Sequence, residues 1–381
     1  NHISSDSWPI YISLQKDGIL FKMRRTQDIP DKKSATMFFQ DCKLAHQAQI
    51  TGIRHSIKEI LPPDLLDLTQ LQKEANIRYG FTASEVYDIA QSLYEKKLIS
   101  YPRTSSRYLT EDVFDSLPPI MARLLSWELF PAAKGTASID ISSLFRHVIN
   151  AEKANVHHAI IITGIRPGNL PEKEMLVYRL VAGRMLEAFM PPCRIETTDI
   201  EAICAAQHFK AEQTRIIEAG WHDVFMNSDI IPKSGYSVNE LPEVEKGDTL
   251  NVCGRNLVHK KQLPVNPFTD AELVEYMELN GLGTVSSRTN IIRTLVNRKY
   301  IRYSGKYIVP TPKGMFTYET IRGKKIADTS LTADWEKQLA GLESGMITRQ
   351  DFLNRIRTLA KEMTDDIFNT YSQKEKVSIL K

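Results

Sequence analysis

The organisation of this chain is best followed outward from residues 98–109, which are Leu98-Ile99-Ser100-Tyr101-Pro102-Arg103-Thr104-Ser105-Ser106-Arg107-Tyr108-Leu109. A residue that precedes proline disfavours the helical conformation, so Tyr101 is predicted to be extended and its phenol to project from the end of a helix. In an extended segment Arg103 lies on the same side as Tyr101, where its guanidinium can grip a phosphate beside the phenol. The pattern indicates phosphodiester chemistry, although it is also typical of an ordinary polar loop after a helix.

The composition is that of an ordinary globular protein. The chain has 381 residues, of which 42% are apolar and 25% charged, and it is long enough for two or three domains. No apolar run reaches the roughly 18 residues that a membrane-crossing helix needs, so no membrane partner is expected. The net charge of +3 does not by itself indicate a nucleic-acid-binding protein. Any affinity for DNA must therefore come from local clusters of Arg and Lys.

The cysteines indicate the redox compartment, and the first residue indicates whether the chain is part of a longer protein. No C-x-x-C pair occurs among the four cysteines, which are Cys42, Cys193, Cys204 and Cys253. This scatter predicts neither a zinc ribbon nor a disulfide framework, and it favours a reducing, cytoplasmic compartment. The chain begins at Asn1 without a methionine or a signal-peptide pattern, so we expect it to be part of a longer protein.

Alternating segments flank a helical stretch. Residues 9–23 predict a β-hairpin, and residues 49–60 predict a strand that stops at Pro62-Pro63. Helical patterns follow until Pro191-Pro192, after which strands are expected over 194–203, 214–218 and 249–252. The sequence therefore predicts an α+β multidomain protein with four parts: 1–61, β-rich; 62–191, helical and bearing Tyr101; 192–262, the rest of the β-rich domain; and 263–381, winged-helix-like.

Local signals place the helices of the second part. Two stretches have the spacing of a capping box and predict helix starts, namely Thr69-x-x-Gln72 and Thr82-x-x-Glu85. In the second helix Gln91 and Glu95 are four residues apart and share one face, near the helix exit that carries Tyr101. Taken alone, such a pair is typical of a solvated helix face. The helical pattern is expected to continue through residues 155–163 and over 176–190.

The last part has the outline of a winged helix. A helix capped by Thr269-x-x-Glu272 ends at Gly281-Leu282-Gly283, a second helix is capped near Ser286 or Ser287, and residues 300–309 predict a hairpin. The second helix and the hairpin of such a unit commonly face nucleic acid. Here they carry the local basic cluster, which consists of Arg288, Arg293, Arg298, Lys299, Arg302 and Lys306.

Four segments occur in an order that resembles one family. They are Leu68-Thr69-Gln70-Leu71-Gln72-Lys73-Glu74-Ala75-Asn76, Ala90-Gln91-Ser92-Leu93-Tyr94-Glu95, Ile99-Ser100-Tyr101-Pro102-Arg103-Thr104-Ser105 and Gly281-Leu282-Gly283-Thr284. Over residues 60–345 the chain is similar to the type IA DNA topoisomerases, closest to the bacterial topoisomerase III branch. The resemblance implies an isomerase that cleaves one DNA strand through a 5′-phosphotyrosine bond, passes a strand and religates without ATP. It also implies that the β-rich part forms an arch, and that the partners are single-stranded DNA and underwound duplex DNA near the nucleoid.

The resemblance also implies the site residues, position by position. Tyr101 matches the nucleophile and Arg103 matches the arginine that grips the scissile phosphate. The positions implied to contact DNA or phosphate are Gln91, Glu95, Ser100, Thr104, His157, Ser287 and Arg288. Two departures from the family pattern bear on rate and sequence preference: Ser105 replaces an acidic residue, and Ile162 replaces the proline of the histidine segment.

A phenol whose ordinary pKa is about 10 needs a cation, a base or a metal to attack a phosphodiester near neutral pH. The resemblance implies Mg²⁺ held by an N-terminal Toprim domain with an Asp-x-Asp-x-Glu cluster, but this chain has no such cluster. It also lacks a G-x-x-x-x-G-K-[ST] loop, which agrees with ATP independence. We therefore expect a C-terminal part of a topoisomerase that lacks the Toprim domain, binds no metal itself, binds single strands weakly and turns over poorly or not at all alone.

Three other classes compete with this interpretation. A non-enzymatic winged-helix protein would use Tyr101 only as a loop residue and would prefer duplex DNA. A tyrosine recombinase would need an H-x-x-R motif upstream of a late tyrosine, but no such motif occurs. A zinc enzyme is not supported, because His157-His158 lacks the spacing of four residues that places two ligands on one helix face.

Overall fold

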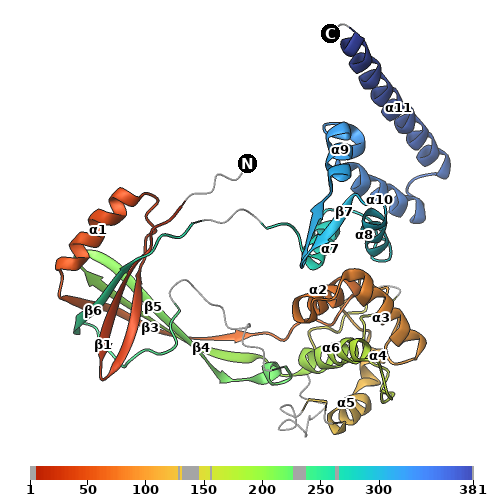
Figure 1. The fold of residues 1–381 in the computed structure, drawn as a ribbon. Coiled ribbons are helices and arrows are strands. Elements are labelled where there is room, and N and C mark those ends of the chain that lie inside the picture. The colour runs from red at the N-terminus through yellow and green to blue at the C-terminus, as the bar shows by residue number, and fades with distance from the viewer. Residues whose placement is uncertain are drawn as a thin grey trace. The chain divides into compact units, whose positions relative to one another are not determined.

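The computed structural model describes residues 6–127, 129–130, 146–154, 157–225, 237–261 and 266–379. The chain divides into two compact units (Figure 1). The barrel unit comprises Asn1–Pro63, Leu125–Arg146 and Leu186–Asn266. The tyrosine unit comprises Asp64–Leu124, His147–Met185 and Pro267–Lys381.

Six antiparallel strands form the barrel, which closes in the order β1-β2-β5-β4-β3-β6. Their bounds are β1 Ile10–Lys16, β2 Ile19–Arg25, β3 Gln47–Ile60, β4 Cys193–Cys204, β5 Gln207–Glu218 and β6 Thr249–Leu257. The predicted hairpin is confirmed as β1 and β2, which turn at Asp17-Gly18. β5 begins seven residues before the predicted Thr214, because Phe209 and Ala211 point into the core as it pairs with β4.

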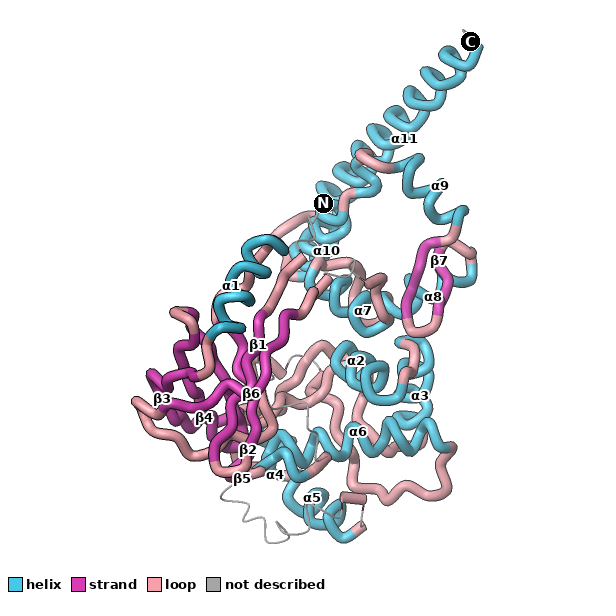
Figure 2. Tube along the Cα trace, turned by 60° about the vertical axis from the view of Figure 1, so that its left-hand side comes forward, coloured by secondary structure: helices cyan, strands magenta, loops and turns pink. Residues whose placement is uncertain are grey.

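The barrel core is built by alternation along the strands. Ile10, Ile12 and Leu14 of β1 are all fully buried, as a period of two predicts for residues on the inner face. Helix α1 (Lys32–Leu44) contributes Ala35 and Cys42 to the same core. The strands and this helix thus share one apolar interior, and Figure 2 shows α1 lying beside the strands.

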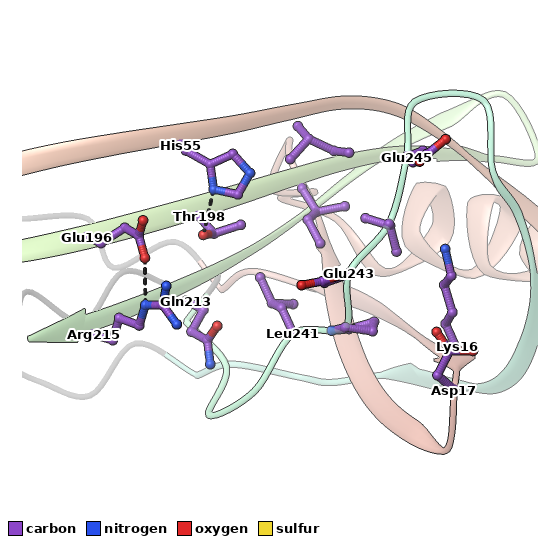
Figure 3. Close-up of a pocket in the computed structure, with 14 residues that line it drawn as sticks. Lys16, Asp17, His55, Glu196, Thr198, Gln213, Arg215, Leu241, Glu243 and Glu245 are labelled. Atoms are coloured by element: carbon purple, nitrogen blue, oxygen red, sulfur yellow. Dashed lines mark hydrogen bonds and ion pairs between the residues drawn. The ribbon is translucent and has the colours of Figure 1, made fainter. Parts of the chain in front are cut away.

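A polar pocket of about 560 Å³ opens on this unit. Figure 3 shows that β3, β4, β5, the β1–β2 turn and residues 241–245 line it. Its lysine and its arginine are both paired within the unit, Lys16 with Asp248 at 2.6 Å and Arg215 with Glu196 at 2.5 Å. None of the residues predicted to act on DNA lies in this pocket.

Helices dominate the segment between the barrel strands: α2 Leu68–Tyr79, α3 Ala83–Glu95, α4 Glu111–Asp115, α5 Leu117–Ser126 and α6 Glu172–Phe189. The capping box at Thr82 and Glu85 is confirmed. The one predicted at Thr69 is wrong, because Asp67 caps α2 by accepting from the Gln70 N–H at 2.7 Å.

The expected helix over residues 155–163 is also wrong in the described part, residues 157–163. Ile160 forms an antiparallel bridge with Leu66, and Ile162 forms one with Ile99. All four of these side chains are buried, so tertiary pairing with two distant segments replaces the local helical preference. Residues 155–156 lie outside the described residues.

Residues 267–381 belong to the tyrosine unit. Their elements are α7 Asp270–Leu279, α8 Arg288–Asn297, β7 Ile301–Ser304, β8 Tyr307–Pro310, α9 Pro312–Ile321, α10 Thr329–Glu343 and α11 Arg349–Ile379. The predicted order of helix, glycine turn, helix and hairpin is therefore confirmed. Gly281 and Gly283 both have positive φ, which allows the sharp turn between α7 and α8. Among the described helices none is long and apolar enough to cross a membrane.

Candidate active site around Tyr101

The chain turns sharply where α3 ends, just before Tyr101. Lys97 adopts a left-handed conformation with φ of 59°, and the Leu98 N–H returns to the Leu93 carbonyl at 2.9 Å. Leu98 and Ile99 are then buried, with 5% and 1% of their surface exposed. The apolar pair anchors the chain beneath the surface, so the following tyrosine leaves the helix end on a fixed path.

Backbone pairing with the histidine segment continues this path. Ile99 bridges Ile162, and the Ser100 N–H donates to the Ile161 carbonyl at 2.8 Å. The Ser100 hydroxyl donates to the Ala159 carbonyl at 3.1 Å and accepts from the Ile161 N–H at 3.0 Å. Ser100 was predicted to contact DNA, but here its hydroxyl holds two chain segments together.

Thr104 has a similar position on the other side of the tyrosine. Its hydroxyl donates to the His157 carbonyl at 2.7 Å and accepts from the Ser106 N–H at 3.0 Å. The residue is only 3% exposed. The hydroxyl is thus buried and bonded within the protein, where it fixes the backbone of His157, and the contact of Thr104 with DNA stays a prediction.

The phenol of Tyr101 lies between two rings. The Tyr94 ring packs against it edge to face, with centroids 5.4 Å apart and an interplanar angle of 77°. The imidazole of His157 lies on another side, with a centroid distance of 4.6 Å. Tyr101 is half-buried and His157 is exposed. Within the described ranges no hydrogen bond engages the Tyr101 hydroxyl, so the oxygen of the predicted nucleophile carries no protein partner.

Arg103 is held by the surface of α3. Its Nη2 donates to Gln91 Oε1 at 3.1 Å, and Gln91 Nε2 donates to Glu95 Oε1 at 2.8 Å. The guanidinium also lies over the Tyr87 ring, with Cζ 5.0 Å from the centroid. In the described part of the chain Arg103 forms no ion pair. The structure thus brings together Tyr101, Arg103, Gln91, Glu95 and His157.

Ser287 and Arg288 lie at the start of α8, and no hydrogen bond or ring contact joins them to Tyr101 or Arg103 among the described residues. The Ser287 hydroxyl accepts from the Thr284 N–H at 2.8 Å and thereby closes the glycine turn. Arg288 is 8% exposed and pairs with Glu278 at 3.2 Å. Arg288 is therefore held in a largely buried ion pair in this structure, and its contact with phosphate stays a prediction.

Two aromatic residues that contact the site were not predicted from the sequence, namely Tyr87 and Tyr94. Tyr87, Gln91 and Glu95 follow one another at intervals of four residues, which places them along one face of α3. Extending the Gln91–Glu95 pair back by one step would have found Tyr87. Tyr94 packs on the Tyr101 ring, and no spacing rule within α3 alone indicates that contact.

A metal site is not formed by the described residues. They contain no group of three or more His, Cys, Asp or Glu side chains that could hold an ion. Glu95 is the carboxylate tied to the site, and its Oε1 accepts from Gln91. This donor set does not fit a divalent cation, which in proteins takes several oxygen ligands.

Comparisons with known proteins identify relatives of this chain. The family model for DNA topoisomerase matches residues 1–354. "DNA topoisomerase 3" of Bacillus licheniformis is 32% identical over 344 residues, covering 84% of this chain and 47% of that protein. "DNA topoisomerase 3" of Staphylococcus saprophyticus is 29% identical over 394 residues, covering 96% of this chain and 53% of that protein. The chain thus spans about half the length of the curated relatives that it matches.

A solved structure shares the fold. Full-length topoisomerase I from Thermotoga maritima superposes with a TM-score of 0.72 at 21% identity, covering 95% of this chain and 59% of that one. The match to the family model extends over most of the chain and includes the Tyr101 segment, α3 and the α7–α8 turn. The chain therefore belongs to the type IA DNA topoisomerases.

Proposed function

We propose that this chain supplies the nucleophile of a topoisomerase that cleaves one DNA strand, passes a strand through the break and religates it. The observation that carries the proposal is the Tyr101 hydroxyl, which has no hydrogen-bond partner among the described residues, on a ring that lies against His157 and two residues before an arginine without an ion pair. Single-stranded DNA and underwound duplex DNA in the cytoplasm are the proposed substrates. The barrel unit is proposed to serve as the arch.

The proposed step exchanges one phosphodiester for another. Tyr101 Oη attacks the phosphorus of a DNA strand and loses its proton, while the bond from phosphorus to the 3′-oxygen breaks. The departing 3′-oxygen takes up a proton and becomes a hydroxyl, and the 5′-phosphate stays on the tyrosine. Religation reverses each change. Because the two linkages are similar in energy, no ATP is needed.

The neighbours of Tyr101 have separate proposed roles. The Arg103 guanidinium stabilises negative charge on the phosphoryl oxygens. Such stabilisation lowers the barrier most when the donors are already in position before the reaction. His157 contacts the phosphate from the exposed side. Gln91 and Glu95 orient Arg103 and lie beside the bound strand. Ser100 and Thr104 keep the tyrosine and histidine segments in register.

The described residues offer no donor set that fits a metal ion, so they are not proposed to hold one. Type IA enzymes depend on Mg²⁺, and we assign that ion to a Toprim domain outside residues 1–381. The chain alone is then proposed to bind single strands weakly and to turn over poorly or not at all.

The test uses a 3′-labelled single-stranded oligonucleotide. The chain is incubated with it alone and together with a separately expressed Toprim domain of a related enzyme plus Mg²⁺, then denatured and examined for labelled protein. We expect an adduct in the mixture that is lost in Tyr101→Phe and retained in Tyr108→Phe, a second tyrosine of the same segment. A mixture of folded parts that gives no Tyr101-dependent adduct contradicts the proposal.

One observation favours a second candidate, a winged-helix protein that only binds DNA. Four basic side chains around the β7–β8 hairpin are exposed, namely Arg298, Lys299, Arg302 and Lys306. The second helix supports this reading less, because Arg293 is tied to Asp88 at 2.8 Å and Arg288 to Glu278. Tight duplex binding without any adduct would select this candidate.

A further inference from the structure

The face of α3 that meets Arg103 begins with an aromatic ring. The capping box of Thr82 and Glu85 fixes where the helix starts, and hence which residues face the tyrosine segment. Counting by fours from Tyr87 gives Gln91 and then Glu95. The half-buried Tyr87 ring lies 5.0 Å from Arg103 Cζ, one helical turn before the amide that accepts from Arg103 Nη2.

Arg103 has no carboxylate partner among the described residues, whereas two other arginines of this unit, Arg107 and Arg288, each pair with one. Arg107, four residues later, pairs with the buried Asp67 at 2.8 Å, and Arg288 pairs with Glu278. Those carboxylates neutralise the charge and occupy donors. The buried Nε of Arg103 also has no hydrogen-bond acceptor among the described residues.

An aromatic face can hold a guanidinium without using its hydrogen-bond donors. The attraction acts between the positive plane and the negative face of the ring. The edge of the guanidinium, where the N–H donors lie, is left uncovered by the ring, so the Nη donors of Arg103 beyond the one given to Gln91 stay available to a phosphate. A carboxylate in the place of Tyr87 would fix Arg103 equally well, but it would compete with the phosphate for the same donors.

We infer that Tyr87 is a positioning residue, which holds the Arg103 guanidinium in place with its charge unpaired and its remaining Nη donors free for the scissile phosphate. This inference rests on the proposed function, in which Arg103 grips that phosphate. Tyr87 itself touches neither the substrate nor Tyr101 in this scheme. Its ring, not its hydroxyl, performs the role, so phenylalanine should replace it.

The first experiment observes Arg103 directly, without DNA or activity. In the ¹H–¹⁵N spectrum of the full chain, the Arg103 Nε–H signal is identified by its loss in Arg103→Lys. We expect an order parameter in the rigid range, about 0.85, for the natural chain and Tyr87→Phe, and a fall below about 0.6 in Tyr87→Leu. Tyr108→Leu is the matched control, since that ring holds Lys153 at 4.9 Å instead. An unchanged Arg103 signal in Tyr87→Leu overturns the inference.

The second experiment measures affinity for a fluorescent single-stranded oligonucleotide in a double-mutant cycle. Tyr87→Leu should weaken binding about threefold to tenfold, the range that loss of one cation–π contact predicts. The same change should have no effect in the Arg103→Ala background, because the ring acts through Arg103. Additive effects overturn the inference. If the Arg103 signal changes while Arg103→Ala leaves affinity intact, the positioning stands and the proposed phosphate contact of Arg103 fails.

Discussion

Two small hydroxyl residues, Ser100 and Thr104, flank Tyr101 and hold the histidine segment to the tyrosine segment. Each bonds main-chain atoms of that segment: Ser100 bonds Ala159 and Ile161, and Thr104 bonds His157. Because these partners are backbone groups, the two side chains set the separation of the segments whatever side chains those segments carry. At the site, Ser100 and Thr104 therefore fix the distance between the tyrosine and histidine segments.

Thr104→Val is expected to destabilise the tyrosine unit by about 1–3 kcal/mol. The shape is kept, but the carbonyl of His157 loses its donor and the N–H of Ser106 loses its acceptor in a buried place. The free energy of unfolding in urea measures the change. Ser105→Ala is the control, since Ser105 is exposed and its replacement should change stability by less than about 0.5 kcal/mol. Equal effects of the two substitutions would contradict this account.

At the scale of elements, the sequence predicted correctly those helix starts and turns that depend on contacts between residues close in the chain. Thr82 and Thr269 form the capping boxes that their spacing indicates, and the β1–β2 hairpin turns where Asp17-Gly18 predicts. Thr69 failed as a cap because Asp67, two residues earlier, bonds the helix start, and the Gln72 amide bonds Thr289 at 2.8 Å instead.

The contacts of the candidate site were predicted only where they join residues close in the sequence. Tyr101 and Arg103 follow from one contiguous segment, and the Gln91–Glu95 hydrogen bond follows from helical spacing. The extended form of residues 157–163 depends on Leu66 and Ile99, which are far away in sequence, so no local pattern could reveal it. The burial of Arg288 likewise depends on Glu278 across the glycine turn.

Helix α3 carries the groups that face Arg103 and Tyr101, so its first turn matters to the site. Thr82→Ala removes the side-chain acceptor of the Glu85 N–H and should cost about 0.5–2 kcal/mol. Thr82→Ser keeps the hydroxyl and should retain most of that stability. Hydrogen exchange of the first α3 amides is the measurement. Equal protection in both variants would show that packing alone sets the start of α3.

At the scale of the whole molecule, an ion-paired carboxylate within the tyrosine unit makes the stability of that unit depend on pH. In the tyrosine unit, burial opposes ionisation of Glu74, but the nearby Arg184 and Arg78 guanidinium groups outweigh it and lower the pKa of this carboxyl below its ordinary value. Arg184 donates to Glu74 at 3.0 Å, and so does Arg78. The ionised pair joins α2 to α6.

This pair predicts acid sensitivity for the tyrosine unit. A carboxyl whose pKa is lower in the folded state stabilises the fold above its unfolded pKa, and this stability is lost as pH falls through the folded pKa. Protection of the α2 amides from hydrogen exchange should therefore fall below about pH 4.5, the ordinary glutamate range. Glu74→Gln should lower the free energy of unfolding by up to about 3 kcal/mol at pH 7, and the stability of this variant should no longer fall in acid. Parallel loss in the barrel strands would show instead that both units open together.

The bridges from Ile160 and Ile162 to Leu66 and Ile99 can form only after both segments have been synthesised. A ribosome makes Tyr101 well before His157 and the strand-like residues that follow it. At about 5–20 residues per second, about 3–12 seconds pass between the addition of Tyr101 and that of residue 163, and longer before residue 163 leaves the exit tunnel. During that interval the phenol lacks the imidazole and the backbone partners that fix it. A nascent chain therefore carries its tyrosine as an ordinary side chain until the whole segment has been translated.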